Sequence, residues 1–311
     1  MDKNSKIYVA GSTGMVGSAI IRSLKTNNYI NVITHTHDEI DLTDIQAVDK
    51  FFEQNRPEYV IDAAAKVGGI KANSEQMADF LMENMLIQNN LINSSLKYNV
   101  QKFLFLASAC IYPKFSQQPI KEESLLTGAL EPTNEGYALA KIVGLKACEY
   151  IHRQYGKNYI TAMPANAYGI NDCFDPNNSH VIPALIKRFD EAKDNNVPEV
   201  IMWGTGKALR EFLYVDDLAD ACIFLLEHYD DEQFINIGSG EEVSMGELAS
   251  IIKDVVGYTG QISYDTTKPD GMLRRIVDSR KISEMGWKAK VTLREGIEKE
   301  YMWYLENIKN T

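Results

Sequence analysis

The stretch KIYVAGSTGMVGSAI, residues 6–20, decides the fold of this chain. It begins with an apolar run typical of a buried strand, continues through Gly11, Gly14 and Gly17, and ends in a helical pattern. Glycines at such a turn let the backbone bend tightly and approach a pyrophosphate, which binds at the positive end of the following helix. The stretch therefore predicts a nucleotide-binding turn of Rossmann type, with a purely structural turn as the alternative.

Apolar runs alternate with amphipathic stretches through the first half of the chain. Strands are expected at KIYVAG, NVITHT, YVIDAAA and KFLFLAS, with helices between them, the longest at residues 77–99. Strands that alternate with helices imply right-handed crossovers and a parallel sheet. The expected fold class is therefore α/β, a Rossmann-type doubly wound parallel sheet with a smaller C-terminal substrate-binding lobe.

The pattern changes near residue 170. GINDCFDPNNSH (169–180) is rich in Asn and Asp and predicts a loop that leaves the sheet. FLYVDDLADACIFLLEH (212–228) and FINIGSG (234–240) predict a helix and a strand that return to it. We expect a nucleotide-binding domain and a smaller substrate lobe, with these boundaries: 1–169 plus about 213–240 for the domain, and about 170–212 plus 241–311 for the lobe.

Composition limits the classes of partner. The net charge of -11 and the pI of about 5.0 argue against nucleic acid and anionic membranes, since both call for a basic surface. The four cysteines form no CxxC pair, so neither a disulfide framework nor a metal site is expected. The sequence shows no signal peptide and no apolar run long enough to span a membrane, and we expect a cytoplasmic protein.

EGYALAK, residues 135–141, places Tyr137 and Lys141 four residues apart, on one face of a helix. Reduction of a carbonyl needs a proton for the developing alkoxide, and a tyrosine can exchange it when a neighbouring cation stabilises the phenolate. Lys141 is that cation, and Ser108 would hydrogen-bond the substrate oxygen. The pair alone could arise by chance, but with the glycine turn it predicts a nicotinamide-dependent reductase.

Together these motifs resemble the extended short-chain dehydrogenase/reductase superfamily over essentially the whole chain. More closely, the chain resembles the GDP-L-fucose synthase family in the stretches AAAKVGGI, CIYPK, LEPTNE, NSHVIPALI, REFLYVDD and KPDG. The resemblance implies an NADPH-dependent enzyme of surface polysaccharide biosynthesis that epimerises carbons 3 and 5 of a GDP-4-keto-6-deoxymannose-type sugar and then reduces the carbon 4 ketone. It also implies a homodimer that pairs through two long helices.

SACIYPKF, residues 108–115, contains the cysteine of most interest, Cys110. The resemblance implies that Cys110 and His180 act as acid and base in the epimerisations. A proton next to a ketone is acidic because the enolate is delocalised, and a thiol and an imidazole both titrate close enough to neutrality to exchange it. Three cysteines are expected to be structural filler: Cys148, Cys173 and Cys222.

The resemblance also implies the binding residues. Cofactor contacts are expected at Gly11, Ser12, Thr13, Gly14, Met15, Val16, Gly17, His37, Asp38, Leu106, Ala107, Ser108, Lys141, Pro164, Asn166, Ala167 and His180. Substrate contacts are expected at Arg188, Trp203, Arg210 and Asp270. Guanidinium groups suit phosphate oxygens, an indole can pack on ribose or guanine, and a carboxylate can accept a hydroxyl. The residues expected to be solvated charge are Lys187, Lys207, Arg274 and Arg275.

The chain departs from the family pattern at a few positions. Thr13 stands where the family usually has an arginine, and the family's other basic residue for the NADP phosphate lies near the place of His37, so NADH stays an alternative to NADPH. Ala165 and Ala167 replace bulkier residues and would enlarge the pocket, and Gly136 stands where a proline is common. The alternative is therefore a 4-reductase for a related GDP-keto-sugar, such as a GDP-keto-heptose, with lost or partial epimerase activity. A catalytically silent Rossmann sensor is disfavoured by the intact Ser–Tyr–Lys set.

Overall fold

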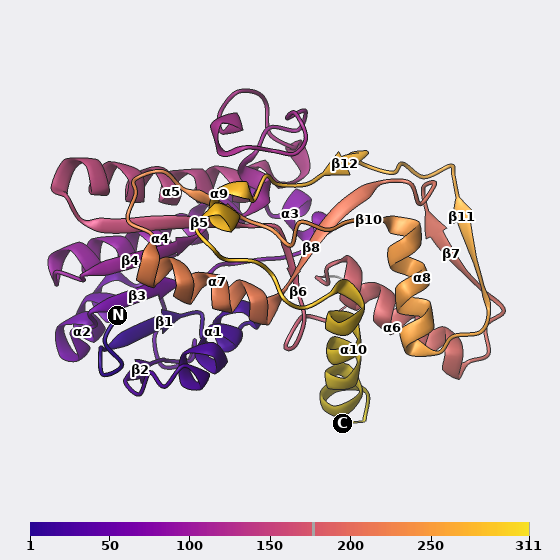
Figure 1. Cartoon of the computed structure of the whole chain (residues 1–311), viewed down its shortest axis with the longest axis horizontal. Helices are drawn as coiled ribbons and strands as arrows, with labels where there is room; N and C mark the ends of the chain where they lie inside the picture. Colours follow the sequence, from indigo (N-terminus) through magenta and orange to yellow (C-terminus); the bar gives the residue numbers. More distant parts are fainter. Residues whose placement is uncertain (176–177, 311) are drawn as a thin grey trace.

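The computed structural model describes residues 1–175 and 178–310 (Figure 1). Its larger body is built on a six-stranded parallel sheet in the order β2-β1-β3-β4-β5-β9. The strands are β1 (Ile7–Ala10), β2 (Val32–Ile33), β3 (Tyr59–Asp62), β4 (Lys102–Leu106), β5 (Asn158–Pro164) and β9 (Ile235–Ile237). The chain reverses its direction of travel across the sheet between β1 and β3, and in such sheets ligands bind at the carboxyl ends of the strands near this point.

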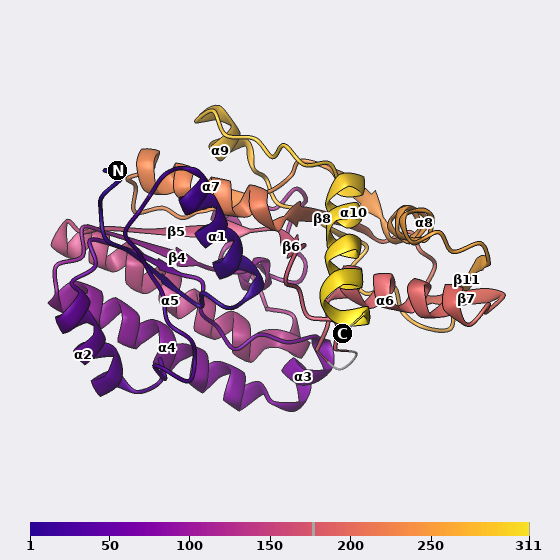
Figure 2. The same cartoon turned by 90° about the horizontal axis from the view of Figure 1, so that it is seen from below.

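Helices cover both faces of the sheet, with α1 and α7 on one side and α2, α4 and α5 on the other (Figure 2). Their bounds are α1 (Met15–Thr26), α2 (Ile45–Asn55), α4 (Met77–Lys97), α5 (Glu135–Tyr155) and α7 (Val215–His228). Short helices complete this body: α3 (Ile70–Glu75), α9 (Arg280–Glu284), η1 (Ala109–Ile111), η2 (Glu122–Ser124) and η3 (Pro132–Asn134). The predicted fold class, a doubly wound α/β sheet, is therefore confirmed.

The smaller lobe extends from one end of the larger body (Figure 1). Its strands are β6 (Asn166–Tyr168), β7 (Glu199–Trp203), β8 (Leu209–Tyr214), β10 (Glu242–Ser244), β11 (Gln261–Asp265) and β12 (Arg274–Arg275). Its helices are α6 (Val181–Asp194), α8 (Met245–Val256), α10 (Leu293–Tyr304) and the terminal turn η4 (Leu305–Lys309). Strand β8 pairs with β6, β10 and β12, so it is the centre of the sheet that joins the lobe to the larger body.

One expected element differs from the structure. FLYVDDLADACIFLLEH does not form a helix throughout, because residues up to Tyr214 belong to strand β8 and α7 begins at Val215. Phe212, Leu213 and Tyr214 are strand-forming residues that pair with β6. Asp216 and Asp217 lie in the first turn of α7, where their negative charges interact favourably with the positive end of the helix dipole. In the expected loop GINDCFDPNNSH, residues 169–175 and 178–180 form no helix or strand, and residues 176–177 lie outside the described part.

The buried apolar residues form two clusters. The first lies around the six-stranded sheet, and the second lies between the helices and strands of the lobe. Val277, Ile282 and Trp287 belong to the first cluster, although we expected them in the lobe, because the chain passes back beside β9 before it reaches α10. None of the helices within 1–175 and 178–310 is long and apolar enough to cross a membrane.

Candidate active site

The expected catalytic residues gather where strand β4 ends. Beyond Ser108 the chain enters the 3-10 turn Ala109–Ile111, which contains Cys110. Helix α5 packs against this turn and brings Tyr137 and Lys141 to it. The carboxyl end of β4 therefore holds a hydroxyl, a thiol, a phenol and an ammonium group in one place.

The Lys141 ammonium is buried and fixed by the backbone. Its Nζ donates a hydrogen bond to the Leu106 carbonyl at 2.9 Å. The same atom lies 4.7 Å from the centre of the Phe105 ring and 5.9 Å from the centre of the Tyr137 ring. The structure thus brings Tyr137 and Lys141 together, as their spacing predicted.

The pKa of the Tyr137 phenol lies above its ordinary value. Burial is the main cause, the nearby Cys110 and Asp62 groups raise the pKa further, and a hydrogen bond with Ser108 lowers it. The Lys141 ammonium, 5.9 Å from the centre of the ring, is not a main cause of this shift, and its stabilisation of the phenolate stays a prediction. The phenol stays protonated at neutral pH, which is the form that donates a proton to a carbonyl under reduction.

A buried carboxyl group, Asp62 at the end of β3, lies on the same face of the sheet. Its Oδ1 accepts a hydrogen bond from the Ala64 amide at 3.1 Å, while its Oδ2 is buried without a partner among the described residues. Burial raises the pKa of Asp62 to about 6, and Lys141 opposes this shift. Sequence reasoning missed Asp62, although an acid at the end of the apolar run YVID is an unusual choice.

The Cys110 thiol is buried, with 7% of the residue exposed. Burial raises its pKa, whereas a hydrogen bond with Ser108 and the charges of Arg275 and Lys141 lower it. Arg275 donates a hydrogen bond to the backbone carbonyl of Ala109, directly before Cys110. Our expectation that Arg275 is a solvated charge is therefore wrong.

The other cysteines are placed differently. Cys148 and Cys222 lie inside the first cluster, where burial raises the pKa of both thiols, that of Cys222 to about 12. Cys173 is exposed. Neither buried thiol is therefore a ready acid or base near neutral pH. Within the described residues, no group of three His, Cys, Asp or Glu side chains could hold a metal ion.

His180 lies at the start of α6 rather than within the group at the end of β4. Its side chain is half-exposed, and its Nδ1 lies 3.9 Å from Oδ1 of the buried Asp172. The nearby Asp172 carboxylate raises the pKa of His180 and favours the imidazolium. Sequence reasoning missed Asp172. No hydrogen bond or ion pair joins His180 to Cys110 in the described part of the chain.

The loop AAAKVGGI, residues 63–70, follows β3 and borders the candidate site. Asn84 on α4 fixes the backbone of this loop at Lys66. Its Oδ1 accepts a hydrogen bond from the Lys66 amide at 2.9 Å, and its Nδ2 donates one to the Lys66 carbonyl at 3.1 Å. A Cβ on Gly69 would lie 3.4 Å from the Ser179 carbonyl. The segment that carries His180 therefore borders the loop that follows β3.

The glycine turn after β1 is shaped by close backbone contacts. Gly11 has φ +76°, which side chains rarely adopt, and a Cβ on Gly17 would lie 2.0 Å from the Gly11 carbonyl. A Cβ on Gly14 would have its nearest neighbour at 3.5 Å, and no side chain caps the first amides of α1. These amides are free to hold a phosphate, so the residues present fit a dinucleotide.

The turn is tied to the end of β2. The Ser12 hydroxyl donates to the His35 carbonyl at 2.7 Å, and beyond this point His37 and Asp38 are exposed. His35, which sequence reasoning did not select, has its Nε2 2.5 Å from the Tyr8 hydroxyl. His37 and Asp38 are thus free for a ligand, whereas His35 is used inside the fold.

The strand-end loop after β5 also reaches this edge. Asn166 donates to the backbone of β8 at 3.0 Å, and the missed residue Asn171 donates to the Thr13 carbonyl at 2.8 Å. Ala165 is buried in the first cluster and Ala167 packs against it, so Ala165 offers little room to a ligand. The remaining expected cofactor residues lie in α1, at the end of β4 or at the end of β5: Met15, Val16, Leu106, Ala107 and Pro164.

Arg210 on β8 is half-buried beside a second arginine. Its guanidinium donates to the carbonyls of Leu209 and Met272 at 2.8 and 2.7 Å. Arg275 is its register partner on β12, and burial together with the Arg275 charge lowers the pKa of Arg210. Two neighbouring guanidinium groups make this position suited to an anion.

The other residues expected to bind the substrate lie elsewhere in the smaller lobe. Asp270 accepts hydrogen bonds from the Thr205 amide at 2.6 Å and the Thr205 hydroxyl at 2.8 Å, so its carboxylate shapes the turn after β7. Trp203, at the end of β7, is 71% exposed. Arg188 is exposed on α6. The indole and this guanidinium are available to a ligand, whereas Asp270 is already engaged.

The departure at Gly136 has a structural reason. A Cβ at this position would lie 2.4 Å from the Met77 carbonyl at the start of α4. Helix α5 therefore approaches α4 closely just before Tyr137, and any side chain here would push the two helices apart.

The comparisons with known proteins agree with this geometry. Residues 7–238 match the NAD dependent epimerase/dehydratase family. GDP-L-fucose synthase 1 of Arabidopsis thaliana is 54% identical over 99% of this chain and 96% of its own length.

Two solved structures are also similar. One is a GDP-6-OMe-4-keto-L-xylo-heptose reductase from Campylobacter jejuni, with 38% identity, a TM-score of 0.92 and coverage of 98% of this chain and 99% of that one. The other is a GDP-D-glycero-L-gluco-heptose synthase from the same organism in the presence of NADPH, with 37% identity, a TM-score of 0.92 and the same coverage. The chain therefore belongs to the NAD dependent epimerase/dehydratase family and, within it, to the GDP-L-fucose synthase family.

Proposed function

We propose that this chain is an NADPH-dependent epimerase–reductase that converts GDP-4-keto-6-deoxymannose to GDP-L-fucose. The observation that carries the proposal is the grouping of Cys110 with Ser108, Tyr137 and Lys141, because it puts an acid–base thiol beside a carbonyl-reducing set. The 54% identity to a GDP-L-fucose synthase over the whole chain supports the same reaction. A similar synthase with NADPH present supports NADP(H) as the cofactor.

The reduction needs a hydride and a proton. NADPH, when bound, supplies the hydride to carbon 4. Tyr137, kept neutral by burial, donates the proton to the ketone oxygen, and Ser108 orients that oxygen by a hydrogen bond. Lys141 places a fixed positive charge beside the phenol, which favours the negative charge left on Tyr137 after the transfer.

The epimerisations use the proton next to the ketone. We propose that Cys110 and His180 lie on opposite faces of the sugar, where one removes the proton and the other returns one. The enolate formed in between carries its charge on the ketone oxygen, where Ser108 and Tyr137 can hydrogen-bond it. Asp172 holds His180 toward its charged form, which suits a proton donor.

We also propose a division of binding between the two parts of the chain. Residues 1–169 with about 213–240 would bind NADP(H), and the free amides of α1 support this. The lobe, about 170–212 and 241–311, would bind the sugar nucleotide. Arg210 supports this assignment because its guanidinium lies beside that of Arg275, and the local positive charge suits a diphosphate at Arg210.

A second candidate is a 4-reductase that acts on a GDP-keto-heptose. The similarity to two Campylobacter jejuni heptose enzymes, at 37 and 38% identity, favours it. The small side chain of Ala167 at the expected nicotinamide position would leave room for a larger sugar. Either product would serve surface polysaccharide synthesis.

One experiment separates these functions. GDP-4-keto-6-deoxymannose is incubated with the protein in heavy water and followed by NMR, first without and then with NADPH. We expect deuterium at carbons 3 and 5 before NADPH is added, and GDP-L-fucose afterwards. Reduction without exchange would identify a plain 4-reductase, and no turnover would direct the assay to GDP-keto-heptoses.

We further propose that the chain forms a homodimer through α4 and α5. These helices pack side by side and leave apolar side chains exposed: Met82, Leu86, Leu139 and Val143. A paired copy would cover this face.

The mass in solution tests the dimer. We expect sedimentation to give twice the 35.1 kDa chain mass for the wild type, and the single-chain mass for the double variant Leu86→Glu with Val143→Glu. Ile30→Glu, at an apolar side chain that is 70% exposed elsewhere, should leave the dimer intact. A monomeric wild type at micromolar concentration would contradict the proposal.

A further inference from the structure

The strand that carries Arg275 is anchored on several sides. The Ile276 amide donates to Oε1 of Gln118 at 2.9 Å, and the Val277 amide donates to the buried carboxylate of Glu211 at 3.0 Å. Ile120 pairs with Val277 in a parallel bridge, and its amide donates to the Ile276 carbonyl at 2.8 Å. The backbone beside Arg275 is therefore fixed relative to the loop that follows Cys110.

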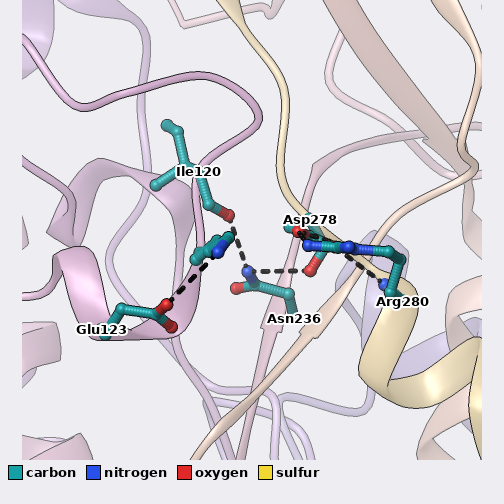
Figure 3. Close-up of polar contacts among 6 residues, drawn as sticks. Ile120, Glu123, Asn236, Asp278 and Arg280 are labelled. Carbon is teal, nitrogen blue, oxygen red and sulfur yellow. Dashed lines mark hydrogen bonds and ion pairs between the residues drawn. The ribbon is translucent and has the colours of Figure 1, made fainter.

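A buried asparagine strengthens this junction (Figure 3). The Nδ2 atom of Asn236 donates to the Ile120 carbonyl at 3.0 Å and to the Asp278 carbonyl at 3.2 Å. Its Oδ1 accepts from the Tyr112 hydroxyl at 2.5 Å. Because Tyr112 directly follows the turn that contains Cys110, this amide links that turn to the segment after Arg275.

From this anchored strand, the Arg275 guanidinium contacts the turn Ala109–Ile111, which contains Cys110. One amino group donates to the Ala109 carbonyl, and the other lies 3.3 Å from the Met272 sulfur. In the described ranges, no carboxylate lies within ion-pair distance of Arg275, whereas its neighbour Arg274 pairs with Glu242 on the surface. The positive charge of Arg275 is thus not compensated by an adjacent acid.

The groups that face Cys110 come from three elements. Ser108 precedes it on the same loop, Tyr137 and Lys141 face it from α5, and Arg275 faces it from β12. Lys141 is held by the carbonyl of Leu106, the last residue of β4, which precedes the turn. Arg275 is the cation that bonds to the turn itself.

We propose that Arg275 is a positioning residue for Cys110, which fixes the Ala109–Ile111 turn and supplies the positive charge that stabilises the thiolate. When the thiol donates its proton to the sugar carbon, a C–H bond forms, the S–H bond breaks and the enolate returns to the ketone. The sulfur keeps the electron pair, and the guanidinium offsets its charge. This inference rests on the proposed function for the acid–base role of Cys110, but its test does not need a substrate.

The test is the pH dependence of Cys110 alkylation by iodoacetamide, followed by mass spectrometry of the peptide that contains Cys110. In Arg275→Met we expect the apparent pKa of the thiol to rise by about one unit, so that alkylation below it is about tenfold slower. Arg275→Lys should restore most of the wild-type profile because it keeps the charge. Arg274→Met, the matched control, should leave the profile unchanged.

A second variant guards against a folding defect. Arg275→Gln can still donate to the Ala109 carbonyl without a charge, and we expect it to shift the profile like Arg275→Met. Thermal melting confirms that each variant is folded. An alkylation profile that both uncharged variants share with the wild type would overturn the proposal. If the profile shifts while the wild type exchanges no deuterium into GDP-4-keto-6-deoxymannose, the positioning role stands and the proposed substrate fails.

Discussion

Replacing Tyr137 with phenylalanine is expected to lower the rate of ketone reduction by about 10²- to 10⁴-fold, the usual effect of removing a general acid. The hydroxyl is the group that contacts Ser108 and that burial keeps protonated at neutral pH. The ring would remain in its edge contact with Phe80, at 6.4 Å between ring centres, so the fold should persist. The loss of NADPH absorbance in the presence of the GDP-keto-sugar measures the rate.

The same helix offers a matched control for this variant. Tyr150 lies on α5 and is 53% exposed, so Tyr150→Phe removes a phenol hydroxyl without touching the site. It should reduce the ketone at the wild-type rate. Binding of NADPH, measured by its fluorescence, should be retained in Tyr137→Phe. A Tyr137→Phe enzyme within threefold of the wild-type rate would show that another group supplies the proton.

The parts of the site that the sequence predicted are local in the chain. Gly11, Gly14 and Gly17 lie in one turn, and Tyr137 and Lys141 lie one helical turn apart. Their geometry follows from a strand-to-helix turn and a helix period, which a sequence pattern encodes directly. The parallel sheet follows in the same way from the alternation of strands and helices.

The parts that the sequence did not predict depend on distant contacts. Arg275 donates to a carbonyl 166 residues earlier, and nothing in the run LRRIVD separates it from Arg274, which pairs with a surface acid. Asp172 gains its role only because the loop brings it beside His180. Asp270 matches a motif, yet Thr205 already engages its carboxylate. In each case the role of the side chain depends on a neighbour that only tertiary packing brings close.

The helix predicted from FLYVDD onward starts too early for a related reason. An apolar run is compatible with a buried helix or a buried strand, and periodicity alone does not separate them. Here Phe212, Leu213 and Tyr214 pair with β6, a strand of only three residues that the sequence did not mark. The strand exists because the lobe supplies a partner for it.

Replacing Cys110 with serine is expected to abolish epimerisation and leave reduction in place. Serine keeps the size and the hydrogen bond with Ser108, but its hydroxyl is far too weak an acid to exchange a proton near neutral pH. Deuterium entry at carbons 3 and 5 should therefore fall by at least about 100-fold, as for loss of a general acid or base. NMR in heavy water without NADPH measures the exchange.

The expected product distinguishes this variant from an inactive one. Tyr137, Lys141 and Ser108 remain, so with NADPH the variant should reduce the ketone of the unepimerised sugar and yield a GDP-6-deoxyhexose with the starting configuration at carbons 3 and 5. Cys173→Ser, at the exposed cysteine, should exchange and reduce like the wild type. Undiminished exchange in Cys110→Ser would remove the Cys110 thiol from the mechanism and would leave His180 or a bound water as the carrier of both protons.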